Sequence, residues 1–290
     1  MCVFWIGGFM ENKDKKIYSY SRLENYHTCP YAYYITYVEK NRGEDNIYSF
    51  LGSTVHEILE ELQQRLINNG EAIEKFENAI TEADILGYEW MSDGVKNKYI
   101  AAIKHYLEHY KPIKCDEYFI EEYFEIPVGD KWMKGYIDLY TITDGVIDIY
   151  DYKTSSSSSF TGKDAYKKMR QMILYGIAIK QKHPDKEIRS MNFDMLKYYK
   201  VPSKRSKLGY TLKDRSTIDI LDFTTEFTPA YVSAEFTPEV VNEVTEYVCN
   251  TVNEIESLDK DLSCYEKGFD PKKDFFCKTL CSFRDRCLSE

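Results

Sequence analysis

The sequence lacks three features that would each assign it to a well-defined class of protein. No apolar run approaches the roughly 20 residues that cross a membrane as a helix. There is no G-x-x-x-x-G-K-[ST] motif, so no nucleotide-driven motor is indicated. An excess of positive charge is also missing, since the formal net charge is −10. This charge argues against a coat on nucleic acid, which needs a broad basic surface. It does not exclude an enzyme of nucleic acids, because a site for divalent metal is itself acidic.

The first residues also lack the marks of a signal peptide. The opening MCVFWIGGFM is apolar but short, with no basic start and no A-x-A-like cleavage site. Met10 stands just before a polar stretch and is an alternative start, which would make residues 1–9 an upstream extension. We therefore expect a cytoplasmic protein. Residues 1–17 are expected to form a disordered N-terminal extension.

Residues 18–290 are expected to form a single domain, because the length suffices for one large domain with a substantial core. Two short helices are predicted within residues 18–40, broken at Cys29-Pro30. Ser19 or Ser21 would cap the first of them, and Pro30 suits the first turn of the second.

A helical block is predicted over residues 40–112. Its first helix spans residues 46–70 and would end at Gly70, and two more follow over 71–84 and 94–111. The apolar stripe of the first helix consists of Leu51, Val55, Leu59, Leu62 and Leu66.

From residue 113 the apolar period changes from helical spacing to alternation, and residues 113–230 are expected to form the core of the domain. Gly129-Asp130 and Asp144-Gly145 are signals for hairpin turns. Strands are predicted over 117–128, 131–142, 145–154 and 187–199, with a short one over 218–228. Helices are predicted over 164–182 and 238–258, an exposed basic loop over 201–216, and a tail with little periodicity over 259–290.

Two carboxylates are expected to face each other across the second hairpin. With Asp144-Gly145 as a two-residue turn, Asp138 pairs with Asp151, whereas a three-residue turn would shift the register by one. Opposed like charges are destabilising, and a divalent cation would compensate them, because hard cations bind carboxylate oxygens. Lys153 shares the face of Asp151 and would stabilise developing negative charge or help to activate a water. The alternative is an exposed strand end with ordinary charges.

Further polar residues precede and follow this hairpin in a defined order. His56 lies beside the apolar stripe of the first long helix, where a single histidine is more often a packed or solvated residue. Gln171 and Tyr175 are four residues apart on a predicted helix and share one face. The order is His, then G-x-x-D from Gly135 to Asp138, then D-x-K, then Q-x-x-x-Y. This order resembles the PD-(D/E)XK nuclease superfamily in its RecB-like branch.

The resemblance implies a role for each of these residues. Asp138, Asp151 and Lys153 would be catalytic, and Gln171 and Tyr175 would hold the DNA strand near the scissile phosphate. Mg²⁺ or Mn²⁺ would be bound by His56, Asp138, Asp151 and the backbone carbonyl of Tyr152.

The cysteines form a second pattern. Cys277, Cys281 and Cys287 have the spacing C-x3-C-x5-C, and Cys29 stands far upstream. Four thiolates suit either zinc or an iron–sulfur cluster, and the spacing does not decide between them. Cys264 is a lower-ranked substitute ligand, and ordinary reduced thiols are the remaining alternative.

The stretch SYSRLENYHTCPYAYYITY resembles the start of RecB-like nucleases with an iron–sulfur cluster, including CRISPR adaptation exonucleases and the AddB subunit of helicase–nucleases. Those proteins carry one cysteine before the nuclease motifs and three after them, usually as C-x2-C-x5-C, so this chain has one extra residue in the first gap. The resemblance implies a [4Fe-4S] cluster that closes the tail onto Cys29. The implied fold is α/β, with a central mixed sheet flanked by helices in a restriction-endonuclease-like core.

The implied function is metal-dependent hydrolysis of DNA, by an exonuclease or flap-type nuclease on single-stranded ends. Helicase, recombination or CRISPR-adaptation proteins would be its partners, and no membrane association is expected. The rival hypotheses are a catalytically idle DNA-end-binding subunit and a zinc-stapled interaction protein. The 26 tyrosines are interpreted as codon bias rather than as stacking on bases.

Overall fold

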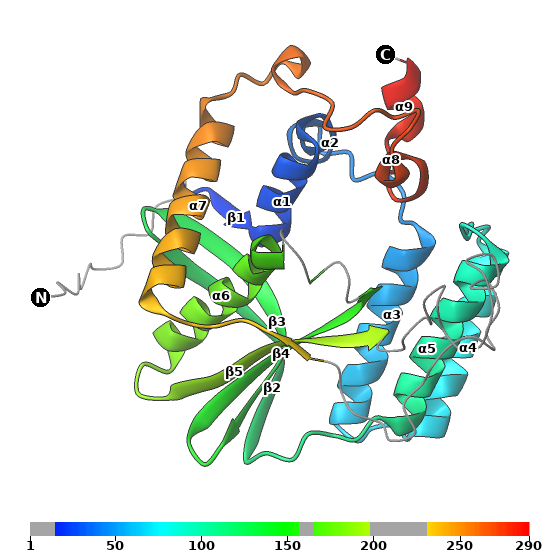
Figure 1. Ribbon diagram of the computed structural model, residues 1–290, viewed down its shortest axis with the longest axis vertical. Coiled ribbons are helices and arrows are strands. Elements are labelled where there is room, and N and C mark those ends of the chain that lie inside the picture. Colours follow the sequence, from blue (N-terminus) through cyan, green and yellow to red (C-terminus); the bar gives the residue numbers. More distant parts are fainter. Residues whose placement is uncertain (1–14, 157–159, 161–164, 198–230, 290) are drawn as a thin grey trace, which may run out of the picture.

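The computed structural model describes residues 15–156, 160, 165–197 and 231–289 (Figure 1). The predicted basic loop and the predicted strand over 218–228 lie outside these residues. The strands are β1 (Ile17–Ser19), β2 (Glu117–Val128), β3 (Lys131–Thr143), β4 (Val146–Ser156), β5 (Glu187–Lys197) and β6 (Tyr231–Ser233). The longer helices are α1 (Tyr20–Thr28), α3 (Ile47–Gln63), α4 (Asn69–Ile85), α5 (Asp93–His109), α6 (Ala165–Lys182) and α7 (Pro238–Ser257). The short ones are α2 (Pro30–Tyr33), continued by a π-helical turn (Tyr34–Val38), a 3₁₀ turn (Leu262–Cys264), α8 (Phe275–Thr279) and α9 (Arg284–Ser289).

The strands form one mixed sheet in the order β1-β3-β4-β5-β6, with β2 on the other edge of β3. The two tight turns make β2–β3 and β3–β4 antiparallel, whereas α6 provides the crossover that makes β4 and β5 parallel. Helices α1, α6 and α7 cover one face and α3, α4 and α5 the other (Figure 1). The expected central mixed sheet flanked by helices is thus confirmed.

Two sequence predictions about boundaries are wrong. Helix α3 ends at Gln63 rather than at Gly70, because Asn68 starts a new helix with a capping box that places Gly70 in the first turn of α4. Leu66 consequently leaves the stripe and is 67% exposed. Residues 15–17 do not belong to a disordered extension, since Ile17 begins β1 and pairs with β3. Residues 1–14 lie outside the described part.

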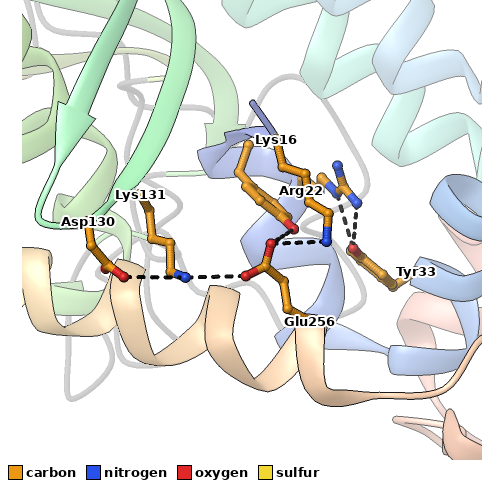
Figure 2. A network of polar contacts seen from close by, with 7 residues as sticks. Lys16, Arg22, Tyr33, Asp130, Lys131 and Glu256 are labelled. Atoms are coloured by element: carbon orange, nitrogen blue, oxygen red, sulfur yellow. Dashed lines mark hydrogen bonds and ion pairs between the residues drawn. The ribbon is translucent and has the colours of Figure 1, made fainter. Parts of the chain in front are cut away.

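A polar network holds α7 against β1 and the β2–β3 turn (Figure 2). The carboxylate of Glu256 accepts hydrogen bonds from the Tyr18 hydroxyl (3.1 Å) and from Lys131 Nζ (3.2 Å), and it pairs with Lys16 at 3.3 Å. Lys131 also lies 3.5 Å from Asp130 in the turn. The network therefore fixes the short strand β1, which has few ladder bonds of its own, beside the start of β3.

The edge of β3 opposite β2 is shared by two strands. β1 pairs with its residues from Trp132 to Lys134, and β4 pairs with those from Leu139 to Thr143. Between them lies the stretch from Gly135 to Asp138, which pairs with neither strand. This interval coincides with the G-x-x-D motif and opens the sheet edge at that point. Among the described residues, no helix is long and apolar enough to cross a membrane.

Candidate active site

The regular alternation of β2 and β3 shifts by one residue at Glu121 and Asp138. On β3, Ile137 and Tyr140 pack into the same core although they are three residues apart, and on β2 Phe119 and Phe124 pack against that core. Glu121 has a φ of 47°, in the left-handed region, and the β2–β3 ladder has no pair at Glu121 and Asp138. Such local irregularities re-aim side chains, and here they turn two carboxylates toward α3.

His56 of α3 meets these carboxylates. Helix α3 packs its apolar stripe on the sheet, and this packing places His56 Nδ1 3.3 Å from Asp138 Oδ2. One ligand atom from each of His56, Glu121 and Asp138 lies within 4.8 Å of the other two. An imidazole and two carboxylates converge as they would on a divalent cation.

Glu121 was missed by the sequence reasoning, although a signal for it existed. The first hairpin turn, Gly129-Asp130, sets the register of β2 on β3. In that register Glu121 is the residue opposite Asp138, although the two do not form a ladder pair. The second turn sets a register in which Asp151 is the residue opposite Asp138 on β4. Each of the two strands beside Asp138 therefore carries a carboxylate at this level. Applying the turn rule to both hairpins would have found the residue.

The second hairpin has the predicted register, as shown by the pairs from Thr143–Val146 to Leu139–Tyr150. The regular pairing ends there, so Asp138 and Asp151 are not a ladder pair as was expected. The reason is that the Asp138 side chain takes a backbone partner: Tyr152 N–H donates to Asp138 Oδ2 at 2.8 Å. The strands consequently diverge where the charged residues lie.

The remaining predicted residues form a connected chain of contacts on the α6 side of the sheet. Lys153 Nζ contacts the carboxylate of the buried Asp151 and donates to Gln171 Oε1 at 3.3 Å. Gln171 Nε2 donates to the Tyr175 hydroxyl at 2.7 Å, and this hydroxyl donates to Asp151 Oδ2 at 3.2 Å. Gln171 and Tyr175 can meet because they lie one turn apart on α6. The four side chains hold one another in place.

Burial and neighbouring charges raise the pKa of several carboxyl groups at the site. Burial and then the charge of Asp151 raise the pKa of Asp138 well above its usual range, and the pKa of Glu121 is raised by burial and Asp151. Glu60, one turn after His56, has its pKa raised to about 7 by burial and by Glu121. Burial lowers the pKa of His56, which favours the neutral imidazole that binds metals. The donor set and the concentration of carboxyl groups both fit a divalent cation.

Behind the site, buried phenols connect β4 to the helical block. The Tyr110 hydroxyl donates to Gln63 Oε1 (2.9 Å), so the Tyr152 hydroxyl donates to Tyr110 at 3.2 Å. The Tyr106 hydroxyl donates to Asp194 Oδ2 at 2.6 Å. The His56 ring packs edge-on against the Tyr152 ring, with centroids 6.1 Å apart, so the residue expected to bind metal through its carbonyl lies beside the site. These contacts fix the strand that carries Asp151.

A cleft of about 730 Å³ lies beside this site, although its lining includes none of His56, Glu121, Asp138 and Asp151. It lies between α1, α6 and the β2–β3 hairpin, and Lys153, Gln171 and Tyr175 line one part of it. Its floor depends on Gly135: a Cβ there would lie 2.8 Å from the Phe124 ring, which in turn packs edge-on against Tyr175. The glycine of the G-x-x-D motif thus has a packing role.

The four predicted cluster ligands lie near one another, between α2 and the tail. Cys29, Cys277 and Cys287 are buried and Cys281 is partly exposed. Burial and then the neighbouring thiolates raise the pKa of Cys277. The backbone N–H of Gly268 donates to Cys29 Sγ at 3.3 Å.

Gly268 has no room for a side chain, since a Cβ there would lie 2.2 Å from the Thr28 carbonyl oxygen. Further contacts, such as Tyr31 N–H to the Glu266 carbonyl at 3.0 Å, hold the tail on α2. The donor set, four thiols with a backbone N–H aimed at one sulfur, fits a thiolate-bound metal.

Comparison with known proteins gives a family. A family model described as the PD-(D/E)XK nuclease superfamily matches residues 17–288. The B subunit of the ATP-dependent helicase/deoxyribonuclease of Clostridium perfringens strain SM101 is 38% identical over 93 residues, which are 31% of this chain and 7% of that protein. Its counterpart in strain 13 is 45% identical over 62 residues, or 20% of this chain and 5% of that protein. The chain thus matches only a small part of these relatives. With its fold and nearly its whole length matching, the chain belongs to the PD-(D/E)XK nuclease superfamily.

Proposed function

We propose that the protein is a metal-dependent deoxyribonuclease that uses Mg²⁺ or Mn²⁺. The observation that carries this proposal is the convergence of His56, Glu121 and Asp138 beside the Asp151–Lys153 pair. A divalent cation at that point would supply an electrophile for the phosphate and lower the pKa of water. His56, Glu121 and Asp138 would hold it, with Asp151 and the Tyr152 carbonyl as the further ligands expected from the resemblance.

The protein also supplies a positive charge of its own at this point, the ammonium group of Lys153. Its ammonium lies between the carboxylate of Asp151 and the amide oxygen of Gln171, on the same side of the sheet as the cleft. In this position it would stabilise the negative charge that develops on the phosphate during in-line attack. Tyr175 and Gln171 would keep Asp151 and Lys153 in their rotamers and contact the DNA strand.

We further propose that the enzyme acts on single-stranded ends as an exonuclease or flap-type nuclease. The matched relatives are subunits of a helicase/deoxyribonuclease by name, so a separate helicase is a suitable partner. Recombination or CRISPR-adaptation proteins are the other candidate partners.

The test is digestion of end-labelled single- and double-stranded DNA, each with Mg²⁺, with Mn²⁺ and with EDTA. Asp151→Asn and Lys153→Ala should each lower the cleavage rate at least about 100-fold, as loss of a transition-state contact does. Asp185→Asn, a matched change at a 77% exposed side chain, should cleave like wild type. If wild type binds DNA but does not cleave it with either metal, the chain is a DNA-end-binding subunit and the enzymatic proposal fails.

For the cysteines we propose a [4Fe-4S] cluster on Cys29, Cys277, Cys281 and Cys287. The supporting observation is that three of these thiols, Cys29, Cys277 and Cys287, are buried where the tail packs on α2. A metal there would close a loop of nearly the whole chain and restrict the unfolded state strongly. Anaerobically purified protein should be brown with four irons per chain, whereas one zinc per colourless chain would replace the cluster with a zinc staple.

A further inference from the structure

Two tyrosines stand exposed on the cleft side of the β2–β3 hairpin. Tyr123 and Tyr136 are 46% and 54% exposed, although most tyrosines of the described chain are at least partly buried. They are cross-strand partners, and their ring centroids lie 5.2 Å apart with an interplanar angle of 56°. Aromatic rings of this size are buried only when a binding partner covers them, so an exposed pair indicates a binding surface.

The position of this pair connects it to the proposed active site. Tyr136 belongs to the stretch of β3 that pairs with neither β1 nor β4, two residues before Asp138. Both tyrosines line the same cleft as Lys153 and Gln171. A strand that passes Lys153 and continues along this cleft would therefore reach the two rings.

The charges of the cleft favour a polyanion as the occupant. Lys134, Lys153 and Lys168 line it, and Lys153 also contacts the carboxylate of Asp151. The acidic residue of its lining, Glu24, already pairs with Lys168 at 3.7 Å and accepts a hydrogen bond from Tyr247. Hydroxyl groups of Ser19 and Ser21 form part of the opposite wall, on strand β1 and helix α1.

We propose that Tyr123 and Tyr136 form a platform on which unpaired bases of single-stranded DNA stack as the strand enters the active site. Stacking on aromatic rings beside lysines is the common mode of binding single strands, and it tolerates any base because each has a π face. A duplex cannot use such rings, since its bases are already stacked on one another. The platform would give the enzyme its preference for single-stranded ends; this inference rests on the proposed nuclease function for the path of the strand.

The test is binding of a fluorescein-labelled oligonucleotide and of the same sequence as a duplex, with Ca²⁺ as the added metal to slow cleavage. Tyr136→Ala should weaken single-strand binding by about 5- to 150-fold, the range of one lost base stack, and leave duplex binding unchanged. Tyr136→Phe should bind like wild type, because it keeps the ring. Tyr118→Ala is the matched control: Tyr118 is 45% exposed on the same strand as Tyr123 but outside the cleft.

A 2-aminopurine base in the oligonucleotide gives a direct readout of stacking. Wild type should quench its fluorescence at one or two positions, and Tyr136→Ala should abolish that quenching. The proposal is overturned if Phe weakens binding as much as Ala, if Tyr118→Ala has the same effect, or if duplex binding falls in parallel. If wild type cleaves DNA with metal but Tyr136→Ala binds single strands like wild type, the platform is refuted and the nuclease function is not. A platform effect without any cleavage refutes the nuclease function alone.

Discussion

Replacing Asp194 with asparagine should remove a pH dependence from the stability of the protein. Asp194 is 3% exposed on β5, opposite Tyr152 in the sheet. Its Oδ2 accepts the hydrogen bond of Tyr106, and its Oδ1 has no hydrogen-bond partner among the described residues. Burial raises the pKa of this carboxyl from 3.8 to about 7. Below about pH 7 the folded protein therefore holds this acid mainly in its protonated, neutral form.

The direction of the effect follows from proton linkage. Between about pH 4 and pH 7 the unfolded chain has released this proton while the folded chain still binds it, so rising pH favours unfolding. Each unit of pKa difference corresponds to about 1.4 kcal/mol, and the shift from 3.8 to about 7 amounts to about 4 kcal/mol over the whole interval. About 2 kcal/mol of this falls between pH 5.5 and pH 7, above the isoelectric point near 5.2.

The assay is equilibrium unfolding in urea at several pH values from 5.5 to 8, for wild type and Asp194→Asn. Asparagine is neutral at every pH and still offers an oxygen to Tyr106, so the variant should gain about 2 kcal/mol over wild type between pH 5.5 and pH 7.5. Parallel curves for the two proteins would refute the reasoning, because they would show that Asp194 titrates alike in the folded and unfolded states.

Three further predictions concern the metal site, the cleft and the cysteines. Glu121→Gln should weaken Mn²⁺ binding at least about tenfold, as measured by calorimetry or by the spin resonance of free Mn²⁺. Glu122→Gln should not weaken it, because Glu122 is a surface ion-pair partner of Lys182; equal affinities of the two variants would remove Glu121 from the ligand set. Gly135→Ala should lower the free energy of unfolding by about 1–3 kcal/mol, because its Cβ displaces the Phe124 ring, and an unchanged urea midpoint would contradict that packing role. Cys29→Ala should lose both the brown chromophore and thermal stability, while Cys264→Ala should keep both; unchanged colour and melting in Cys29→Ala would disprove the assignment.

The hairpins show how far sequence reasoning reached. Alternation and the turn signals Gly129-Asp130 and Asp144-Gly145 predict β2, β3 and β4 and their register, because a tight turn leaves little freedom in pairing. The same local rules predict α6 and so place Gln171 and Tyr175 on one face. Boundaries were less certain where a cap competes with a helix, as Asn68 does at the end of α3.

By itself the sequence predicted the longer helices, the strands β2 to β5 and the motif order, because these depend on periodicity and on contacts between neighbours along the chain. Only the tertiary structure decided how Asp138 is partnered. Its carboxylate takes the N–H of Tyr152, and its neighbours are His56 from another layer and Glu121 in a left-handed conformation. The open interval between β1 and β4, which makes the cleft, also depends on two distant segments meeting on one edge of β3. Local pattern cannot specify such meetings, since they follow from how layers pack and not from the spacing within any one element.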